Sequence, residues 1–434
     1  MKILITNIWI SMYSGTEVSV RDLSVALHRK GHHVEVFSPI LGKVAEEIRE
    51  AGIHITDQRE KLREKPDIIH AKHYIPAMEA IAMFPDVPVI YFLHDRTHII
   101  DSPPPYSGIV KYVAVDYNCL DRLIIDNGIP PERTDVLLNW VDTDKFRLRK
   151  HFSEQPKRAL VFSNYAKKDN HYQIIKNACD QYGIELDVIG GGFGKNIKDP
   201  ENQLQNYDIV FAKAKAAIEA MATGAAVILC DFRGLGEMVN TRNFDHFRQY
   251  NFGMKMLSNP VEEDSIIREI QKYDATETRK ISRRIIKEAD FGDYLLKITE
   301  LYRDVIREYN STEFIRNKEE DQRRIFEYLD LRQRLHGKVV KDLQLELNQR
   351  QQKIREMNAR LVKLHEQSKE PINHQGYDHQ NDKILKSKNQ LQLYHDHILN
   401  LKKEISDLEH SFSYRLGRTL TYPLRFLYEM SRRK

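Results

Sequence analysis

Short runs of β-branched and apolar residues alternate with amphipathic helical segments in the first third of this 434-residue chain. The runs are KILITNI, HHVEVFS, PDIIHA, VPVIYFL, KYVAVD and TDVLLN. Strands that are apolar along their whole length are typical of parallel sheets with helices on both faces. Helical patterns at Glu17–Lys30 and Lys43–Ala51 lie between them. We therefore predict a doubly wound, Rossmann-like α/β domain over residues 1–150.

The same alternation begins again after residues 147–157, RLRKHFSEQPK, a charged segment that predicts an interdomain linker. The second set of strand-like runs is ALVFSN, ELDVIGG, YDIVFA and AAVILCD, with helical patterns near His171–Gln181 and Ala216–Thr223. We predict a second, smaller Rossmann-like domain over residues 151–285 and a crossover helix within 286–310. Because such sheets bind ligands at the carboxyl ends of their strands, the two domains predict a ligand cleft between them.

Composition and spacing argue against several other classes of protein. The formal net charge is only +4, so we expect no nucleic-acid partner. The cysteines Cys119, Cys179 and Cys230 form no CxxC pair, and the histidines show no HExxH spacing, so we expect neither a metal site nor a disulfide framework. The apolar start MKILITNIWI has no small-residue cleavage site after it and is interpreted as a buried strand rather than a signal peptide. We therefore expect a cytoplasmic protein.

Beyond Asn310 the composition changes to one dominated by Glu, Lys, Arg and Gln. Apolar residues recur there at heptad spacing in two stretches, and Pro371 and Gly376 interrupt the spacing between them. The pattern predicts coiled-coil helices over residues 311–410 with a break near 368–382. Self-association into a homo-oligomer, pairing with a partner helix, or an antiparallel hairpin within one chain would each satisfy it.

The last segment, residues 411–434, combines basic residues with aromatic residues and leucines. An amphipathic helix of this composition binds anionic membrane surfaces, which would make the protein peripheral on the inner face of the cell membrane. The alternative is a helix that docks on the core of the chain itself.

The string AIEAMATGAAVILCDFRGLGEMV, residues 217–239, resembles the donor-binding segment of the retaining glycosyltransferases of family 4. The resemblance extends over roughly residues 1–305 and implies the GT-B fold, in which two Rossmann-like domains face a cleft. It implies that Glu219 accepts hydrogen bonds from the ribose of a nucleotide-sugar donor, and a carboxylate can accept two such O–H groups at once. It also implies that Gly234 and Glu237 form a Gly-x-x-Glu turn in the donor site.

The segment SGTEVSVRDLSVALHRKGHHVEVFSP is similar to the first βαβ unit of the same family. The resemblance implies that Gly15 and Thr16, at the start of a helix, face the donor diphosphate, where free backbone N–H groups attract anions. From the residues alone, a plain tight turn explains Gly15 equally well.

Two departures from the family pattern concern the donor site. Phe211 stands where the family has a second acid, eight positions before Glu219. The strand that opens the second domain lacks the usual Gly-Arg, and Lys167 and Lys168 follow it as candidates for the missing positive charge. The candidates that flank the donor segment are Lys213 and Lys215.

Two histidines follow strands of the first domain, where strand ends should face the cleft. His94 could orient the sugar hydroxyls of the donor, and His73 could act on the acceptor side. Each is equally compatible with a loop or packing role.

These observations favour a glycosyltransferase that moves a sugar from a nucleotide diphosphate to a polysaccharide or lipid-linked glycan acceptor. The family resemblance implies that the transfer proceeds with retention and without a metal, and we expect no other cofactor. Phe211 motivates an alternative, a non-catalytic scaffold for glycan assembly with a degenerate transferase domain and a coiled coil that recruits partners. A third hypothesis is another GT-B enzyme, such as an epimerase or a phosphorylase.

Overall fold

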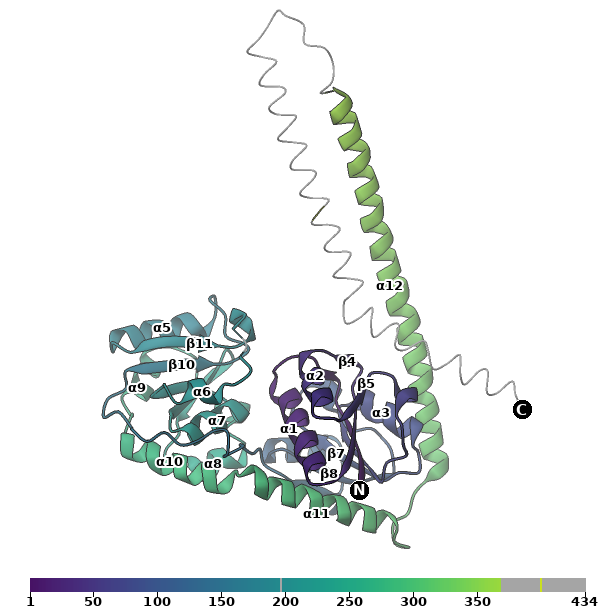
Figure 1. Cartoon of the computed structure of the whole chain (residues 1–434), viewed down its shortest axis with the longest axis horizontal. Coiled ribbons are helices and arrows are strands. Elements are labelled where there is room, and N and C mark those ends of the chain that lie inside the picture. Colours follow the sequence, from purple (N-terminus) through teal and green to yellow (C-terminus); the bar gives the residue numbers. More distant parts are fainter. Residues whose placement is uncertain (196, 368–398, 400–434) are drawn as a thin grey trace, which may run out of the picture. The chain divides into compact units, whose positions relative to one another are not determined.

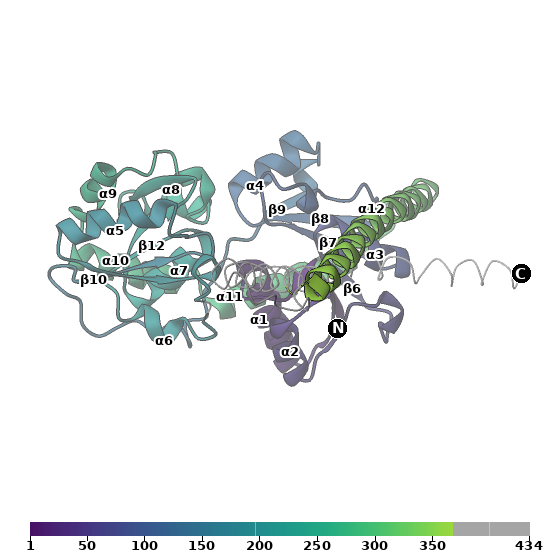
Figure 2. The ribbon, with the colours of Figure 1, turned by 90° about the horizontal axis from the view of Figure 1, so that it is seen from above.

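The computed structural model describes residues 1–195, 197–367 and 399 (Figure 1). The chain divides into two units, Met1–Ile325 and Phe326–Lys434. The first unit contains two α/β lobes, each built on its own sheet. Figure 2 shows these two lobes from above. The second unit is described only through the helix that reaches Gln367, apart from the single residue 399.

The first lobe has a seven-stranded sheet in the order β5-β3-β1-β6-β7-β8-β9, in which every pairing is parallel. Its strands are β1 (Lys2–Thr6), β3 (His33–Phe37), β5 (His54–Thr56), β6 (Ile68–Lys72), β7 (Val89–Leu93), β8 (Ile109–Ala114) and β9 (Thr134–Val136). Strands β6 and β7 are buried along their whole length, as expected of central parallel strands. A small separate sheet pairs β2 (Trp9–Ile10) with β4 (Ile40–Leu41).

The helices of this lobe follow the predicted alternation. They are α1 (Gly15–Arg29), α2 (Lys43–Glu50), α3 (Tyr74–Met83) and α4 (Tyr117–Asp121), with short turns η1 (Arg59–Lys61), η2 (Ile99–Asp101), η3 (Arg122–Asp126) and η4 (Pro131–Arg133). Helix α1 buries Val20, Leu23 and Leu27, which lie on one face because helical residues three and four apart are neighbours.

The second lobe has a five-stranded sheet in the order β11-β10-β12-β13-β14. The strands are β10 (Arg158–Phe162), β11 (Glu185–Ile189), β12 (Ile209–Ala212), β13 (Ala226–Asp231) and β14 (Gly234–Met238). The helices and turns are α5 (His171–Gln181), η5 (Gly191–Phe193), α6 (Glu201–Leu204), α7 (Ala214–Thr223), α8 (Phe244–Gln249), η6 (Met254–Met256), α9 (Glu263–Ile270) and α10 (Ala275–Glu288).

Helices cover both faces of the second sheet, and β12 shows how its residues divide between them. Val210 and Ala212 pack in the core that includes α7 and α10, whereas Ile209 and Phe211 pack in the core that includes α5 and α9. Figure 1 shows these two helical layers on opposite sides of the sheet. The predicted doubly wound α/β architecture is therefore confirmed in both lobes.

Strand β14 corrects one sequence expectation. Gly234–Met238 was expected to form a turn, but it is an antiparallel edge strand paired with β13. Its glycines allow this because the strand lies against η6 and the residue after it: a Cβ on Gly236 would lie 2.6 Å from the backbone oxygen of Met256, and one on Gly234 would lie 2.7 Å from that of Leu257. Strand β5, with only three residues, was also absent from the predicted strands.

Helix α11 (Phe291–Tyr309) begins after the second lobe and packs in the core of the first. Leu295, Ile298 and Tyr302 are buried there, and the Tyr302 hydroxyl lies 2.6 Å from Nδ1 of His70 on β6. Burial of side chains of this size contributes about 1.5–3 kcal/mol each. The predicted amphipathic helix is thus present, and it joins the lobes.

The chain crosses between the lobes at two places that lie side by side. Val141, after β9, donates its N–H to the oxygen of Ala289 at 2.7 Å, and its own oxygen accepts from Phe291 N–H at 3.1 Å. The Trp140 and Phe291 rings stack beside this pairing, with centroids 3.8 Å apart.

The extension begins with α12 (Lys318–Gln367), a single helix of 50 residues that contains the first predicted heptad stretch. Its first turn is fixed to the first lobe because Asp321 accepts hydrogen bonds from the backbone N–H and the hydroxyl of Ser107, both at 2.7 Å. The predicted break near 368–382, nearly all of the second heptad stretch and the basic segment 411–434 lie outside the described residues. Coiled-coil pairing therefore stays a prediction. None of the helices in the described part of the chain is long and apolar enough to span a membrane.

Candidate functional site

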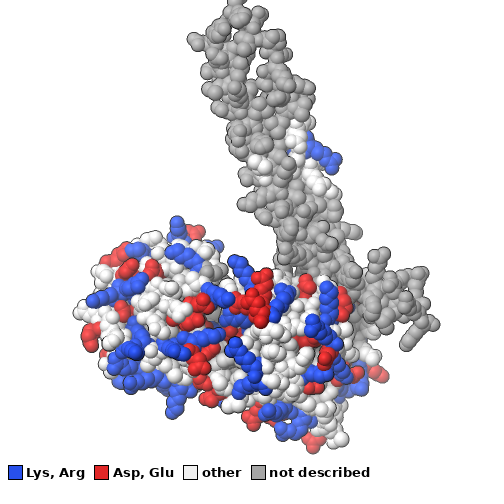
Figure 3. Space-filling model, viewed as in Figure 1, with Lys and Arg blue, Asp and Glu red and all other residues white. Residues whose placement is uncertain are grey.

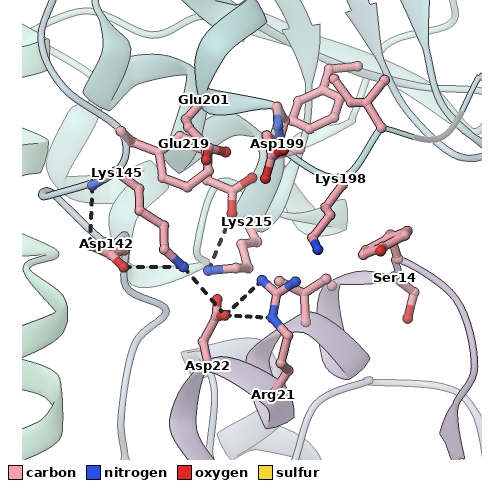
Figure 4. A pocket seen from close by; sticks show the side chains of 18 of the residues that line it. Ser14, Arg21, Asp22, Asp142, Lys145, Lys198, Asp199, Glu201, Lys215 and Glu219 are labelled. Carbon is pink, nitrogen blue, oxygen red and sulfur yellow. Dashed lines mark hydrogen bonds and ion pairs between the residues drawn. The ribbon is translucent and has the colours of Figure 1, made fainter. Parts of the chain in front are cut away.

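A cavity of about 550 Å³ lies between the two lobes of the first unit (Figure 4). The first lobe contributes the turn before α1 and one side of α1 and α2. The second lobe contributes the loops after β10 and β11, residues 197–201 and the start of α7. These second-lobe segments follow the carboxyl ends of parallel strands, where open α/β sheets bind ligands. The cleft predicted between the two domains is present.

Glu219 lies on the cavity wall, in α7, and only 7% of its surface is exposed. Burial raises the pKa of its carboxyl group, and the nearby ammonium group of Lys215 acts in the opposite direction. The Lys215 Nζ atom is 3.4 Å from Glu219 Oε1, one helical turn away. The structure therefore brings together the two residues that the sequence placed beside the donor.

Lys215 is itself held in place by Trp140. Its Nζ atom lies 3.7 Å from the centroid of the indole ring and donates to the Trp140 backbone oxygen at 3.3 Å. Cation–π contacts of this kind contribute about 0.5–2 kcal/mol, more when they are shielded from water. Trp140, which is only 4% exposed, therefore orients the cation that accompanies Glu219.

The first turn of α7 is strained. Ala214 has φ +51°, a left-handed conformation that residues other than glycine rarely adopt. Its N–H is bonded to the oxygen of Phe252 at 2.9 Å. The preceding residue, Lys213, lies 3.0 Å from a carboxylate oxygen of Asp231 and 5.2 Å from the ring centroid of Tyr165. Lys213, Ala214 and Lys215 all line the cavity, so this turn places two cations on its wall.

The turn that opens α1 is organised by Glu17, a residue that the sequence analysis missed. Its carboxylate accepts hydrogen bonds from the backbone N–H of Ser11, from that of Met12 at 2.7 Å and from the Ser14 hydroxyl at 2.9 Å. Ser14 and Gly15 line the cavity, whereas Thr16 does not. The Ser14-x-x-Glu17 spacing, which resembles a capping box, was the signal that could have identified it.

Both signs of charge meet on the cavity wall, and several of the charged residues are paired in Figure 4. Lys145 lies 3.8 Å from Asp22 on α1 and 3.5 Å from Asp142. Asn164 Nδ2 in the second lobe donates a hydrogen bond to the backbone oxygen of Tyr13 in the first lobe at 3.3 Å. A ligand that enters would therefore exchange some of these polar contacts for contacts of its own.

His73 and His94 follow the ends of β6 and β7 and do not line this cavity; His73 is buried, and His94 is half-buried with its Nε2 atom inside. His73 accepts from Ile8 N–H through Nδ1 at 3.3 Å, and its Nε2 lies 3.7 Å from Asp101. Burial lowers the pKa of His73 to about 3, lowers that of Lys72 to about 7 and raises that of Asp101 to about 7. Burial also lowers the pKa of His94, so both imidazoles are neutral.

Four other predicted site residues lie away from the cavity wall. Lys167 and Lys168 are exposed in the turn before α5, where Asn170 accepts the Lys167 N–H at 2.9 Å. Gly234 and Glu237 belong to the edge strand β14, and Glu237 is 3.6 Å from Lys272, just after α9. Both residues follow the donor segment in sequence, but β14 runs antiparallel to β13, back from the carboxyl end of that strand.

Phe211 lies in the core of the second lobe with 1% of its surface exposed. The structure places it on β12, two residues before Lys213. No group of His, Cys, Asp and Glu residues able to hold a metal ion occurs among the residues that the structure describes.

Residues 13–145, which contain the Gly15 turn, match the family model of Glycosyltransferase Family 4. No curated protein matches the chain. Among solved structures, a glycosyltransferase from Rickettsia africae is similar over 71% of this chain and 99% of its own, with 14% identity and a TM-score of 0.53. Anabaena HepE, solved in complex with UDP and glucose, is similar over 70% of this chain and 100% of its own, with 15% identity and a TM-score of 0.50.

The two lobes thus have the GT-B fold, and residues 13–145 of the first lobe match the glycosyltransferase family 4 model.

Proposed function

We propose that this protein is a glycosyltransferase that binds a nucleotide-sugar donor in the cavity between its lobes. The observation that carries the proposal is the position of Glu219, which is buried on the cavity wall beside Lys215. A carboxylate there can accept both ribose hydroxyls of the donor. The cavity volume of about 550 Å³ is within the range of about 300–1,000 Å³ found for small-molecule sites. The UDP complex of a protein with the same fold supports the choice of ligand.

In the proposed reaction, the bond between the anomeric carbon and the diphosphate oxygen breaks, and its electron pair stays on the diphosphate. The acceptor hydroxyl oxygen forms the new bond to that carbon, and its proton passes to the departing diphosphate. Lys213 and Lys215 would stabilise the charge that develops on the diphosphate. One well-placed donor of this kind lowers a barrier by about 3 kcal/mol.

Further parts of the proposal concern the other residues and partners. Retention without a metal or other cofactor is proposed on the family resemblance. The acceptor would be a glycan or a lipid-linked glycan, reached in the cytoplasm at the membrane surface through residues 411–434. Lys and Arg are interspersed with Asp and Glu over the face of the first unit in Figure 3, which supports small-molecule rather than nucleic-acid substrates.

Calorimetry with a panel of UDP- and GDP-sugars tests the donor site. We expect the intact chain to bind one of these donors and Glu219→Gln to weaken that binding at least tenfold. Glu237→Gln is the matched control because this glutamate does not line the cavity. The proposal fails if no nucleotide or nucleotide sugar binds, or if the two variants bind equally.

One observation favours a non-catalytic scaffold as the second candidate. Phe211 occupies the strand position at which the family has an acid, and its side chain is packed in the core. Purified protein that binds a donor but neither transfers its sugar nor hydrolyses it would support this candidate. Turnover of the donor would exclude it.

A further inference from the structure

A carboxylate from α2 lies at the centre of a cluster of hydrogen-bond donors on the cavity wall. Glu47 accepts a hydrogen bond from the Tyr13 hydroxyl and another from Arg21 Nη1 at 2.8 Å. The Lys198 Nζ atom lies 3.7 Å from Glu47 Oε1, the carboxylate oxygen that also accepts from Tyr13. All four residues line the cavity.

The donors around Glu47 come from separate elements of both lobes. Tyr13 precedes α1, Arg21 lies on α1, and Lys198 lies in the second lobe before α6. Partial burial would raise the pKa of Glu47, but the hydrogen bonds from Tyr13 and Arg21 outweigh it and lower the pKa. The surroundings of Glu47 therefore favour an anion.

Asp22 fixes the orientation of Arg21. Its Oδ1 atom lies 2.8 Å from Arg21 Nε and 2.7 Å from Nη2, so one edge of the guanidinium group is occupied. Only Nη1 is directed to Glu47. An arginine held in this way can exchange one anionic partner for another without losing its orientation.

We propose that Glu47 occupies the place of a phosphate group in the ligand-free cavity, and that Arg21 and Lys198 bind the donor diphosphate when it displaces this carboxylate. The inference rests on the proposed function, since it assigns two further residues to the same site. A cluster of one guanidinium, one ammonium and one hydroxyl group suits a phosphate as well as a carboxylate. Gly15, at the start of α1, lines the same cavity, so the phosphate would also approach free N–H groups.

The proposed exchange also concerns the contact between the two lobes. Lys198 is the only member of the cluster that comes from the second lobe. Its transfer from Glu47 to a diphosphate would keep a contact between the lobes, with the ligand as the bridge. Glu47 is then an internal competitor of the ligand, and its removal should strengthen binding.

Titration calorimetry of the full chain with inorganic pyrophosphate and with UDP tests this inference. We expect Glu47→Gln to bind pyrophosphate about tenfold more tightly, and Arg21→Met and Lys198→Met to bind it about tenfold more weakly. The gain should disappear in Glu47→Gln combined with Arg21→Met. Lys176→Met is the control, because Lys176 also pairs with an acid but lies on α5 and does not line the cavity.

The outcomes separate this inference from the proposed function. The inference is overturned if folded Glu47→Gln binds pyrophosphate with unchanged or weaker affinity. It is also overturned if Arg21→Met and Lys198→Met both leave the pyrophosphate affinity unchanged. A lack of pyrophosphate binding by both the parent and Glu47→Gln overturns it as well. Lys198 is 59% exposed at its side chain, so its variant should fold even if the Arg21 variant does not. Pyrophosphate binding that follows the expected order without any nucleotide binding would instead refute only the nucleotide-sugar proposal.

Discussion

Replacement of Lys215 by methionine should destabilise the protein because it leaves the Glu219 carboxylate buried without its cation. Both side chains are nearly buried, with 12% and 10% of their surfaces exposed. Removal of one partner of a buried ion pair costs about 3–5 kcal/mol, and the lost cation–π contact with Trp140 adds about 1 kcal/mol. Partial relaxation of Glu219 toward the cavity reduces this sum, so we expect a loss of about 2–4 kcal/mol in the free energy of unfolding.

The double variant Lys215→Met with Glu219→Gln isolates the charge effect. It removes the unpaired carboxylate, so we expect it to recover at least about 1 kcal/mol relative to Lys215→Met alone. The assay is urea unfolding followed by circular dichroism and by the tryptophan fluorescence of the chain, which comes from Trp9 and from Trp140, whose ring contacts Lys215. Coupling below about 0.5 kcal/mol between the two substitutions would refute the reasoning.

The same variant should show a characteristic pH dependence. Burial already raises the pKa of Glu219, and loss of Lys215 removes a cation that opposes this shift. A carboxyl group with a raised pKa in the folded state costs stability as the pH rises from its unfolded pKa of about 4.3 through the folded pKa. The destabilisation by Lys215→Met should therefore be smaller at pH 4 than at pH 8. An equal loss at both values would contradict an electrostatic cause.

Four further substitutions test the packing and the buried charges. Tyr302→Phe removes the hydrogen bond to His70 at 2.6 Å and should lower the free energy of unfolding by about 1–3 kcal/mol in thermal or urea denaturation. Gly236→Ala brings a Cβ within 2.6 Å of a backbone oxygen and should lower the free energy of unfolding by about 1–3 kcal/mol. Gly15→Ala places its Cβ with no non-neighbouring atom within 4 Å and should change that free energy by less than about 0.5 kcal/mol. Equal effects of the two substitutions would contradict the geometry. Burial raises the pKa of Asp101 to about 7, so its carboxyl group lowers the free energy of unfolding as the pH rises from about 4 to about 7. Asp101→Asn should therefore stabilise the protein more at pH 8 than at pH 5, as measured by denaturation at both pH values.

The elements of the fold that sequence predicted were those with a strong local pattern. Continuous apolar runs identified the central strands β6 and β7, and a stripe of apolar residues identified α11. Strand β5 was missed because three residues show no periodicity. Strand β14 was mistaken for a turn because the glycines that usually mark turns allow here a close approach between two backbone segments.

The candidate site divides in the same way. Glu219 could be found because a long string of neighbouring residues surrounds it. Arg21, Glu47 and Lys198 could not, because they are ordinary charged residues far apart in the sequence and only the arrangement of the lobes brings them together. Lys167 and Lys168 follow a strand whose loop lines the cavity, but they do not line it themselves.

The paired crossings at Val141 and Ala289–Phe291 restrict how the gap between the lobes can widen. Because the two connections lie side by side, one lobe can rotate relative to the other about the line through both connections, whereas twisting about other axes is resisted. Trp140 and Lys215, which contact each other beside this axis, would keep their geometry during such a rotation, while the parts of the lobes far from the axis move apart. Such a joint would let a large substrate enter without disturbing the carboxylate that recognises it.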